Sequence, residues 1–420
     1  MTVPESRDVP DAPPSGPLEA VLGPLRAAIA HAASWSPARF ERAEQIDGIA
    51  GLETVRNAVE ALQAEWTLGF ATAEAAHQTR NGQVEPEKIE RSIGAQVGLA
   101  CRVSPTEGRR RVRTARDLND GLDHLRGLFG AGEVGGYRVS TVVGATSHLD
   151  ARERAEVDRL LSDWDITRLG VGRLRDLARK FAAQVAPDKF RTRCAAARSG
   201  RRVTLRPAAD GMTDLIAHLP AEQGAACYAA LQRAFTEEQV KPAPMTRGRG
   251  QVMADTLVER VTGQTTAEAV GLQVQVVVPV EALVDPASPL PAEIPGHGPV
   301  PVDLIATAAG RKTWRRFVTR DGVVIGGDSK QQRFTGFLAE LVRARDRWRC
   351  SEPYCDAPVR QIDHIRRRAD GGPTTFDDGR GTCVLHNLLR EDPEWTVERV
   401  PDGVRTTTPT GHRYTARRGR

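Results

Sequence analysis

The stretch QIDHIRRRADGGPTTFDDGRGTCVLHN, residues 361–387, gathers unusual side chains near the end of a 420-residue chain. It holds two of the nine histidines, His364 and His386, together with several aspartates and a Cys-x-x-His. A core strand or a surface helix has no need of this mixture. A metal-dependent site does, because imidazole, thiolate and carboxylate groups are the usual metal ligands of proteins.

Two pairs of residues in and before this stretch have the spacing of a zinc site. Cys350-x4-Cys355 is followed after 27 residues by Cys383-x2-His386. Zn²⁺ favours four tetrahedral sulfur and nitrogen ligands, and two short knuckles brought together supply them. We expect a structural zinc ion at these four residues. The alternative is that the cysteines meet by coincidence in a small β-rich tail.

The other three cysteines, Cys101, Cys194 and Cys227, have apolar or small neighbours. They are expected to be buried thiols. Six cysteines in a chain of this size do not resemble the disulfide framework of a secreted protein.

Between the two knuckles, Asp363 and His364 stand side by side between aliphatic residues, as at the end of a strand. Neighbouring side chains of a regular strand point to opposite faces. Both can serve one site only if the strand ends or bulges at His364. The Gly-Gly-Pro at 371–373 allows the chain to leave the strand there.

The composition is that of an ordinary globular chain with a mild positive charge. The formal net charge is +5 and the pI about 9.0, and 45.6 kDa is enough for two or three domains. This charge permits a polyanionic partner without requiring one. The N-terminus lacks the regions of a signal peptide, and no apolar run approaches the roughly 18–20 residues that span a bilayer. We expect a cytoplasmic protein without membrane contact.

The chain divides into stretches of different character. Residues 1–16, rich in Pro and polar residues, indicate a disordered tail. Residues 17–285 are predicted to be mainly helical, 286–335 to be a Pro-rich connection with a β-hairpin, 336–415 to be a small module stabilised by zinc, and 416–420 to be a basic tail. The predicted fold class is therefore α+β.

Helical periodicity is clearest in residues 52–78, where apolar residues recur at i, i+3, i+4 and i+7. Further helices are predicted at 151–163, 170–185, 220–237, 250–262 and 334–348.

Strands are predicted where β-branched residues alternate or run together, at 201–207 and 271–280. Residues 313–329 predict a hairpin around an Asp-Gly turn. The prolines of 286–301 predict an extended loop instead of regular structure.

Ser104-Pro105-Thr106-Glu107 is a strong helix start, with Ser at the cap, Pro in the first turn and Glu placed to close a capping box. The surrounding residues 93–118 also match a helix-turn-helix that would bind DNA. Its second helix would carry Arg109, Arg110, Arg111 and Arg113. We favour the other interpretation, an Arg-rich solvated face of a bundle helix.

The C-terminal motifs CSEPYC, DHIRRRADGGPT and CVLHN, at 350–355, 363–374 and 383–387, resemble the HNH endonucleases. Upstream segments extend the resemblance over about residues 40–415, to a large bacterial family in which a helical domain of unknown function precedes an HNH module. These segments are RRVTLRPAADGM, RGRGQVMADTLVERVTGQTTAE, PGHGPVP and TPTGHRY. The resemblance implies a ββα-metal module and hydrolysis of DNA.

Carried over residue by residue, the resemblance implies the following roles. Asp363 and Asn387 would hold a catalytic Mg²⁺ or Mn²⁺, and His364 would be the general base that takes a proton from the attacking water. The middle Asn of the motif is replaced by Asp378, which can only accept hydrogen bonds when ionised. Asp378 would then order the loop through backbone N–H groups or help to bind the metal.

Arg366, Arg367 and Arg368 adjoin the expected base. They are predicted either to meet DNA phosphates or to be a solvated loop. A metal-dependent DNA endonuclease is the leading hypothesis from the sequence. The alternatives are a catalytically degenerate zinc module that binds nucleic acid without cutting, and a helical interaction protein with a degenerate tail. Metal-dependent cleavage of DNA would distinguish the endonuclease from the zinc module that only binds nucleic acid.

Overall fold

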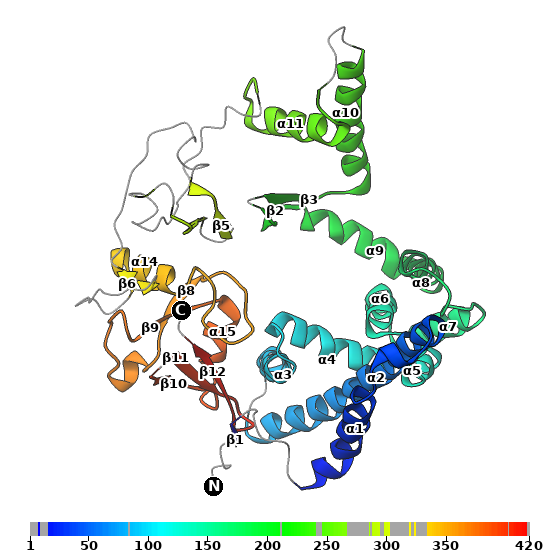
Figure 1. Ribbon diagram of the computed structural model, residues 1–420, viewed down its shortest axis with the longest axis horizontal. Coiled ribbons are helices and arrows are strands. Elements are labelled where there is room, and N and C mark those ends of the chain that lie inside the picture. The colour runs from blue at the N-terminus through cyan, green and yellow to red at the C-terminus, as the bar shows by residue number, and fades with distance from the viewer. Residues whose placement is uncertain are drawn as a thin grey trace. The chain divides into compact units, whose positions relative to one another are not determined.

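The computed structural model describes most of the chain, in several pieces (Figure 1). The described residues are 7–8, 16–82, 85–210, 212–240, 246–266, 285, 288–294, 298–302, 319–320, 323–324, 334–401 and 403–417. They form two compact units. The first comprises residues 1–190 and 327–419, and the second comprises 191–326 with Arg420.

The N-terminal part of the first unit is helical. Its helices are α1 (Pro17–Ala33), α2 (Arg42–Arg80), α3 (Pro86–Ala100), α4 (Pro105–Asn119), α5 (Asp123–Gly130), α6 (Gly136–Thr146), α7 (Ala151–Ser162) and α8 (Val171–Val185), with α9 (Pro187–Ala197) crossing into the second unit. The core between α2 and α4 to α8 includes Leu125, Val139, Leu161 and Leu174, each fully buried. The helices predicted at 52–78, 151–163 and 170–185 are confirmed.

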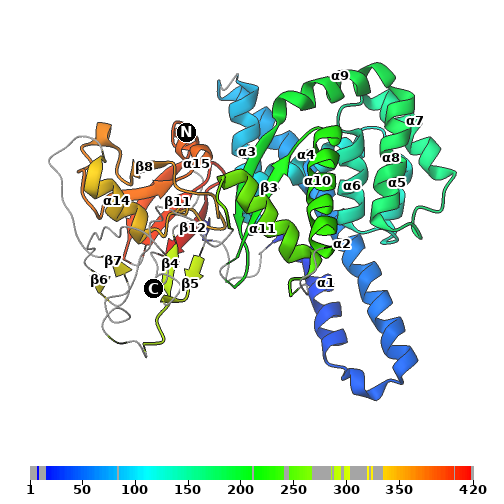
Figure 2. The same ribbon diagram turned by 90° about the horizontal axis from the view of Figure 1, so that it is seen from above.

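Helix α1 buries none of its residues, unlike α2 to α8. Figure 2 shows α1 and the first half of α2 as a hairpin of two helices. Leu22 and Leu25 of this helix nevertheless line a cavity that is described below.

Helices α3 and α4 cross closely because glycines line their contact. A Cβ at Gly108 would lie 2.1 Å from the carbonyl oxygen of Gly94, so only glycine fits there. The predicted helix start is confirmed, since the Glu107 N–H donates to Ser104 Oγ at 3.3 Å. The predicted second half of the capping box is replaced by other contacts, because the Glu107 carboxylate binds Arg110 and Arg111.

The C-terminal part of the first unit combines one helix, a strand pair, a second short helix and a small sheet. In chain order these are α14 (Gly336–Arg345), β8 (Gln361–His364), β9 (Gly379–Thr382), α15 (Val384–Leu389), β10 (Thr396–Val400), β11 (Gly403–Thr407) and β12 (His412–Arg417). Strands β8 and β9 are antiparallel, with Asp363 opposite Arg380 and His364 opposite Gly379. The α14 prediction from residues 334–348 is confirmed.

Strands β10, β11 and β12 form an antiparallel meander. Of the tail predicted to be disordered, residues 1–16, the structure describes Arg7, Asp8 and Gly16. Arg7–Asp8 form β1, which pairs in parallel with His412 and Arg413 of β12. The rest of the tail lies outside the described residues.

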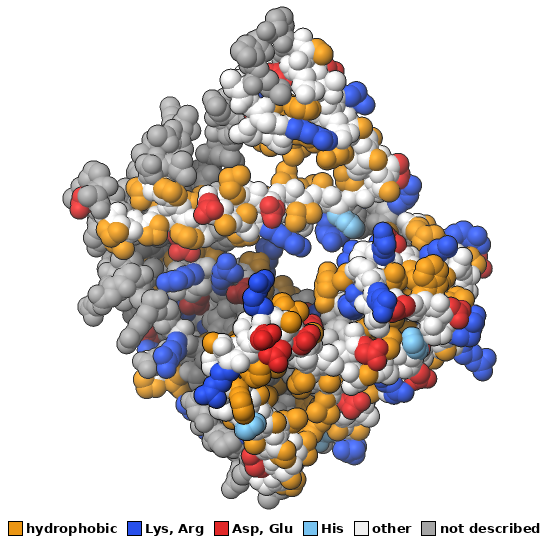
Figure 3. All heavy atoms as spheres, turned by 45° about the vertical axis from the view of Figure 1, so that its right-hand side comes forward, with side chains coloured by type: hydrophobic (Ala, Val, Ile, Leu, Met, Phe, Trp, Pro, Cys, Tyr) orange, Lys and Arg blue, Asp and Glu red, His pale blue; other side chains and the backbone are white. Residues whose placement is uncertain are grey.

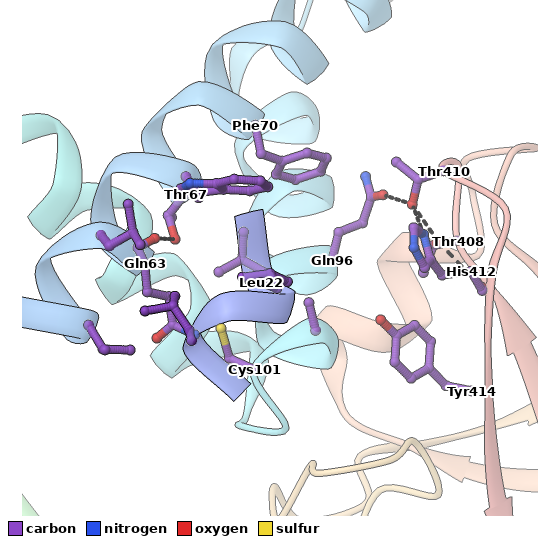
Figure 4. A pocket seen from close by; sticks show the side chains of 16 residues that line it. Leu22, Gln63, Thr67, Phe70, Gln96, Cys101, Thr408, Thr410, His412 and Tyr414 are labelled. Atoms are coloured by element: carbon purple, nitrogen blue, oxygen red, sulfur yellow. Dashed lines mark hydrogen bonds between the residues drawn. The ribbon is translucent and has the colours of Figure 1, made fainter. Parts of the chain in front are cut away.

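The C-terminal part packs on α3. Ala95 and Leu99 of α3 form one buried cluster with Leu389, Trp395 and Tyr414. Figure 4 shows polar contacts beside this cluster, including the Thr410 hydroxyl that donates to Gln96 Oε1 at 2.8 Å. The helical part and the C-terminal part of this unit therefore share a core.

The second unit contains paired strands and two helices. Its elements are β2 (Arg202–Pro207), β3 (Thr213–His218), α10 (Ala221–Gln239), α11 (Arg249–Thr262), β4 (Ala292–Ile294), β5 (Gly298–Val300), β6 (Thr319–Arg320) and β7 (Val323–Val324). The strand predicted at 201–207 and the helices predicted at 220–237 and 250–262 are confirmed. Of the hairpin predicted at 313–329, the structure describes the antiparallel pairing of Thr319–Arg320 with Val323–Val324, and the other residues lie outside the described ranges. The strand predicted at 271–280 lies outside the described residues.

Two predictions about these segments are wrong. The Pro-rich stretch 286–301 contains regular structure, because Ala292–Ile294 pair with Gly298–Val300. A two-stranded pair leaves each strand an open edge, where a proline needs no ladder partner. Cys194 and Cys227, which were expected to be buried, are exposed because α9 and α10 bury none of their residues. Cys101, the residue after α3, is half-buried.

At the level of fold class, the expectation of a mainly helical chain with small β elements is confirmed by these helices and antiparallel sheets. None of the helices in the described ranges is long and apolar enough to span a bilayer.

Candidate functional site

The predicted zinc ligands come together. The ligand atoms of Cys350, Cys355, Cys383 and His386 all lie within 4.8 Å of one another, and all four residues are buried. His386 Nδ1 is 3.3 Å from Cys350 Sγ and 3.4 Å from Cys383 Sγ. Two knuckles supply them, one in the loop after α14 and one at the start of α15. Three sulfurs and one imidazole are a donor set that suits structural zinc.

The buried thiols and the imidazole of the cluster shift one another's pKa values. Hydrogen bonds with Cys355 and Cys383 raise the pKa of the Cys350 thiol, while contacts with the neighbouring thiols lower the pKa of Cys383. Burial favours a neutral His386, but hydrogen bonds with Cys355 and Cys383 raise its pKa to about 10. Buried thiolates that crowd together are stabilised by a bound divalent cation, which neutralises them at once.

Asp363 lies at the end of β8 with one carboxylate oxygen engaged. Its Oδ2 accepts from Arg380 Nη2 at 3.1 Å and Nε at 3.2 Å, and lies 3.4 Å from Arg390 Nε. Its Oδ1 makes no hydrogen bond or ion pair with any residue that the structure describes. One oxygen is thus held by the protein, and the other is available to a ligand.

Arg380 connects this strand to the first zinc knuckle. The Arg380 side chain is 1% exposed, and its Nη1 donates to Glu352, which lies between Cys350 and Cys355. Glu352 also accepts from the Thr406 hydroxyl of β11 at 2.8 Å. The buried carboxylate and guanidinium are therefore both paired, as buried charges must be.

The imidazole of His364 is fixed by two neighbours. Its Nε2 lies 3.0 Å from the hydroxyl oxygen of Thr374, and its ring centroid lies 4.6 Å from that of Phe334. With the proton on Nε2 donated to Thr374, the Nδ1 lone pair can accept a proton. Burial lowers the pKa of His364 below its ordinary value of 6.5, although Asp378 and Asp363 oppose this effect.

Asp378 orders the loop that follows β8. Its Oδ1 accepts from the Arg366 backbone N–H at 3.2 Å, and its carbonyl oxygen accepts from the Ile365 N–H at 2.8 Å. The Asp378 N–H in turn donates to Thr375 Oγ1 at 3.2 Å. This is one of the two roles expected for the residue.

The three arginines after the expected base bind the loop itself. Arg366 Nε donates to the Asp370 carbonyl at 2.9 Å, Arg368 Nη1 donates to Gly372 at 2.8 Å, and Arg367 donates to the carbonyl of Arg390. Arg366 and Arg368 remain exposed. Each guanidinium keeps further N–H groups, so these contacts leave donors for a polyanion.

Asn387 lies on α15, which packs against both β8 and β9. Its half-buried side chain makes no hydrogen bond or ion pair within the described part of the chain. Arg390, which reaches Asp363, follows three residues later and so lies one turn along the same side of the helix. The helix thus directs this region of its surface towards the end of β8.

These residues fit a hard divalent cation. Asp363 Oδ1 and the Asn387 amide oxygen are the kind of ligand that Mg²⁺ and Mn²⁺ prefer. Within the described ranges, the zinc-type cluster is the one group of three or more Cys, His, Asp and Glu side chains placed to hold a metal. A cation at Asp363 would therefore need water and substrate oxygens to complete its shell.

Sequence reasoning did not identify four residues of this site. The sequence predicted no role for Glu352, Thr374, Arg380 or Arg390. Thr374 stands inside the motif DHIRRRADGGPT, and its distance from His364 was the available signal. Arg380 could have been found from the strand register, which places it opposite Asp363.

The helix-turn-helix interpretation gains little from the structure. Helices α3 and α4 form as predicted, but Arg110 and Arg111 pair with Glu107, and Arg116 pairs with Glu90. On the face shown in Figure 3, Lys and Arg side chains lie among acidic and hydrophobic ones.

A cavity of about 590 Å³ lies between α1, α2, α3 and the C-terminal sheet (Figure 4). Apolar side chains dominate its walls, including Trp66, Phe70 and Tyr414. None of the predicted site residues lines it.

The family model described as Domain of unknown function (DUF222) matches residues 49–346. The match covers more than half of the 420 residues and ends before Cys350, so the zinc-type cluster and Asp363–His364 lie beyond it. No curated protein and no solved structure matches the chain.

Proposed function

The chain belongs to the DUF222 family, and from its C-terminal site we propose that it is a metal-dependent DNA endonuclease of the HNH type. His364 is the general base, and Asp363 and Asn387 hold Mg²⁺ or Mn²⁺. The Cys/His cluster holds a structural zinc ion.

The observation that carries the proposal is the pairing of an oriented base with a half-engaged carboxylate. The Thr374 hydroxyl holds His364 through Nε2, while arginines hold Asp363 through Oδ2. What remains for substrate chemistry is one basic nitrogen and one carboxylate oxygen on adjacent residues. The β8–β9–α15 order around them supports the ββα arrangement that the sequence resemblance implies.

The chemistry follows from these groups. His364 Nδ1 takes a proton from water, whose oxygen attacks phosphorus as the bond to the leaving oxygen breaks. A divalent cation, when bound, neutralises charge that accumulates on the phosphate oxygens. Arg366 and Arg368 lie exposed on the adjoining loop and can contact backbone phosphates of the DNA.

The lowered pKa of His364 supports its assignment as the base. A histidine that is neutral at pH 7 can accept the proton, and burial keeps this one neutral.

A zinc module that binds nucleic acid without cutting is the second candidate. Asp378, in place of the amide that the HNH motif usually has, favours it. The carboxylate does accept the Arg366 N–H and so orders the loop, which supports the catalytic proposal instead.

The test is cleavage of supercoiled plasmid by zinc-loaded full-length protein. We expect nicked and then linear DNA with Mg²⁺ or Mn²⁺, loss of cutting with EDTA, and recovery when Mg²⁺ is restored to protein that has kept its zinc. His364→Ala purified in parallel excludes a contaminating nuclease. A shift in DNA mobility without metal-dependent cutting would reject the nuclease in favour of the binding module.

A further inference from the structure

We propose that Arg380 is a positioning residue that turns Asp363 so that it offers only Oδ1 to the catalytic metal, and that ties this carboxylate to the zinc knuckle through Glu352. This inference rests on the proposed function. It concerns the orientation and charge of Asp363.

The guanidinium of Arg380 is engaged along its whole edge. Nε and Nη2 both donate to Asp363 Oδ2, at 3.2 and 3.1 Å, and Nη1 donates to Glu352. A planar fork that spans two carboxylates fixes the angle between them, which a lysine with a single nitrogen cannot do. Arg380 thereby fixes the direction of the Asp363 carboxylate.

Glu352 anchors the far end of this bridge. It lies in the loop between two zinc ligands, Cys350 and Cys355, and it also accepts from Thr406. A correctly formed knuckle therefore holds Glu352, Glu352 holds Arg380, and Arg380 holds Asp363.

The bridge has an electrostatic consequence for metal binding. Asp363 faces two guanidinium groups, since Arg390 Nε lies 3.4 Å from the same Oδ2. Like charges repel, so both arginines oppose a divalent cation at Oδ1. The two arginines therefore weaken the affinity of Asp363 for the metal, and Arg380 at the same time fixes the orientation of its carboxylate.

The effects of losing Arg380 on metal affinity and on cleavage rate distinguish a positioning role from a purely structural one. Removing the charge of Arg380 should strengthen binding of the cation, because less positive charge then offsets the carboxylate of Asp363. It should also slow the reaction, because the orientation of that carboxylate is no longer fixed. If Arg380 only stabilised the fold, its loss would weaken binding and slow cleavage together.

The informative variant is Glu352→Gln/Arg380→Gln, which removes both buried charges together and leaves Asp363 paired with Arg390. Arg380→Lys keeps the charge but loses the fork. The matched control is Arg349→Gln, since Arg349 is a half-exposed arginine of the same knuckle that pairs with Asp356. Zinc content and thermal melting show which variants fold.

Binding of Mn²⁺ to the zinc-loaded full chain, measured by electron paramagnetic resonance, is the readout that does not need activity. We expect the double variant to bind Mn²⁺ about tenfold more tightly than wild type, and to cut plasmid at least tenfold more slowly at saturating Mn²⁺. Arg380→Lys should keep wild-type affinity within about twofold but cut as slowly. Arg349→Gln should match wild type in both measurements.

Unchanged or weaker Mn²⁺ binding by a folded double variant would overturn the inference, as would wild-type cleavage by Arg380→Lys. If the double variant does not fold, Arg380→Lys decides the matter: slow cleavage with wild-type Mn²⁺ affinity supports the positioning role, and slow cleavage with weaker Mn²⁺ binding overturns it. If wild type binds Mn²⁺ but cuts no DNA, the proposed function fails, and the Mn²⁺ affinities still decide the role of Arg380. If wild type binds no Mn²⁺, both fail.

Discussion

The indole N–H of Trp395 donates to the Ser92 hydroxyl at 3.1 Å, across 303 residues of sequence. Trp395 is 2% exposed and packs against Ala95 and Leu99 of α3. Ser92 also accepts from Gln78, whose amide binds Glu74, so the indole ends in a buried polar network. The zinc-type module is therefore fixed to the helical part of its unit by a shared core.

Replacing Trp395 with Ala should destabilise this junction by about 3–5 kcal/mol, the usual cost of deleting a buried aromatic side chain. Chemical denaturation, followed by circular dichroism, measures the change. Trp164→Ala is the control, because Trp164 is 51% exposed and should cost little. Equal effects of the two substitutions would show that the Trp395 contact does not stabilise the unit.

The sequence predicted local structure better than it predicted the contact between Trp395 and helix α3. Cys350-x4-Cys355 and Cys383-x2-His386 carry their geometry in their spacing, because knuckles are short and nearly rigid. Helical periodicity likewise predicted α7, α8, α10 and α11. No local pattern relates Trp395 to Ser92, since their contact depends on how α3 and the C-terminal sheet pack.

Purified protein should contain about one zinc ion per chain, and Cys350→Ser or Cys383→Ser should unfold the C-terminal module selectively. A small module draws much of its folding free energy from its metal. Elemental analysis and thermal melting check this. Cys194→Ser is the control, because Cys194 is exposed and outside the cluster. Protein that melts identically with and without zinc would contradict the assignment.

His364→Ala should lower the cleavage rate roughly 10²–10⁴-fold, the usual contribution of a positioned general base. Binding of DNA should change little, since phosphate contacts supply most of its affinity. Single-turnover cleavage and mobility shift measure the two effects separately. Wild-type cutting by this variant would remove His364 from the mechanism.

The acidic limb of the cleavage–pH profile should lie below pH 6.5, because burial lowers the pKa of His364. The base works when neutral, so activity persists to a lower pH than an ordinary histidine would allow. The same shift makes the folded state lose stability as pH falls from 6.5 towards the lowered pKa, since the unfolded chain takes up the proton first. An acidic limb with its midpoint above pH 6.5 would contradict the claim that burial lowers the pKa of His364.

The supporting residues of the site could not be predicted from spacing. Glu352 lies inside the motif CSEPYC, where no role was expected for it, and Arg380, 28 positions further on, lies in none of the quoted motifs. Their pairing depends on the knuckle, which places Glu352, and on the β8–β9 register, which places Arg380 opposite Asp363. The resemblance to HNH enzymes assigned Asp363 a metal, but it carried no information about the two arginines that hold its other oxygen.

The departure at Asp378 gives the last prediction. Asp378→Asn should raise the cleavage rate, because the amide oxygen can still accept the Arg366 N–H while the amide nitrogen gains the ability to donate. The change also removes a negative charge near His364, where it opposes the approach of a phosphate. The Mg²⁺ requirement should stay constant if Asp363 and Asn387 are the metal ligands.

Plasmid cleavage by wild type and by Asp378→Asn, measured over a range of Mg²⁺ concentrations, distinguishes this outcome from the alternative that Asp378 binds the metal. The control is Asp377→Asn, which removes the same charge from an exposed neighbour that pairs with Arg399 and should leave both rate and Mg²⁺ requirement near wild type. If Asp378 is itself a metal ligand, its amide variant binds the hard cation less well. A higher Mg²⁺ requirement with slower cutting would then replace Asn387 by Asp378 as the second ligand.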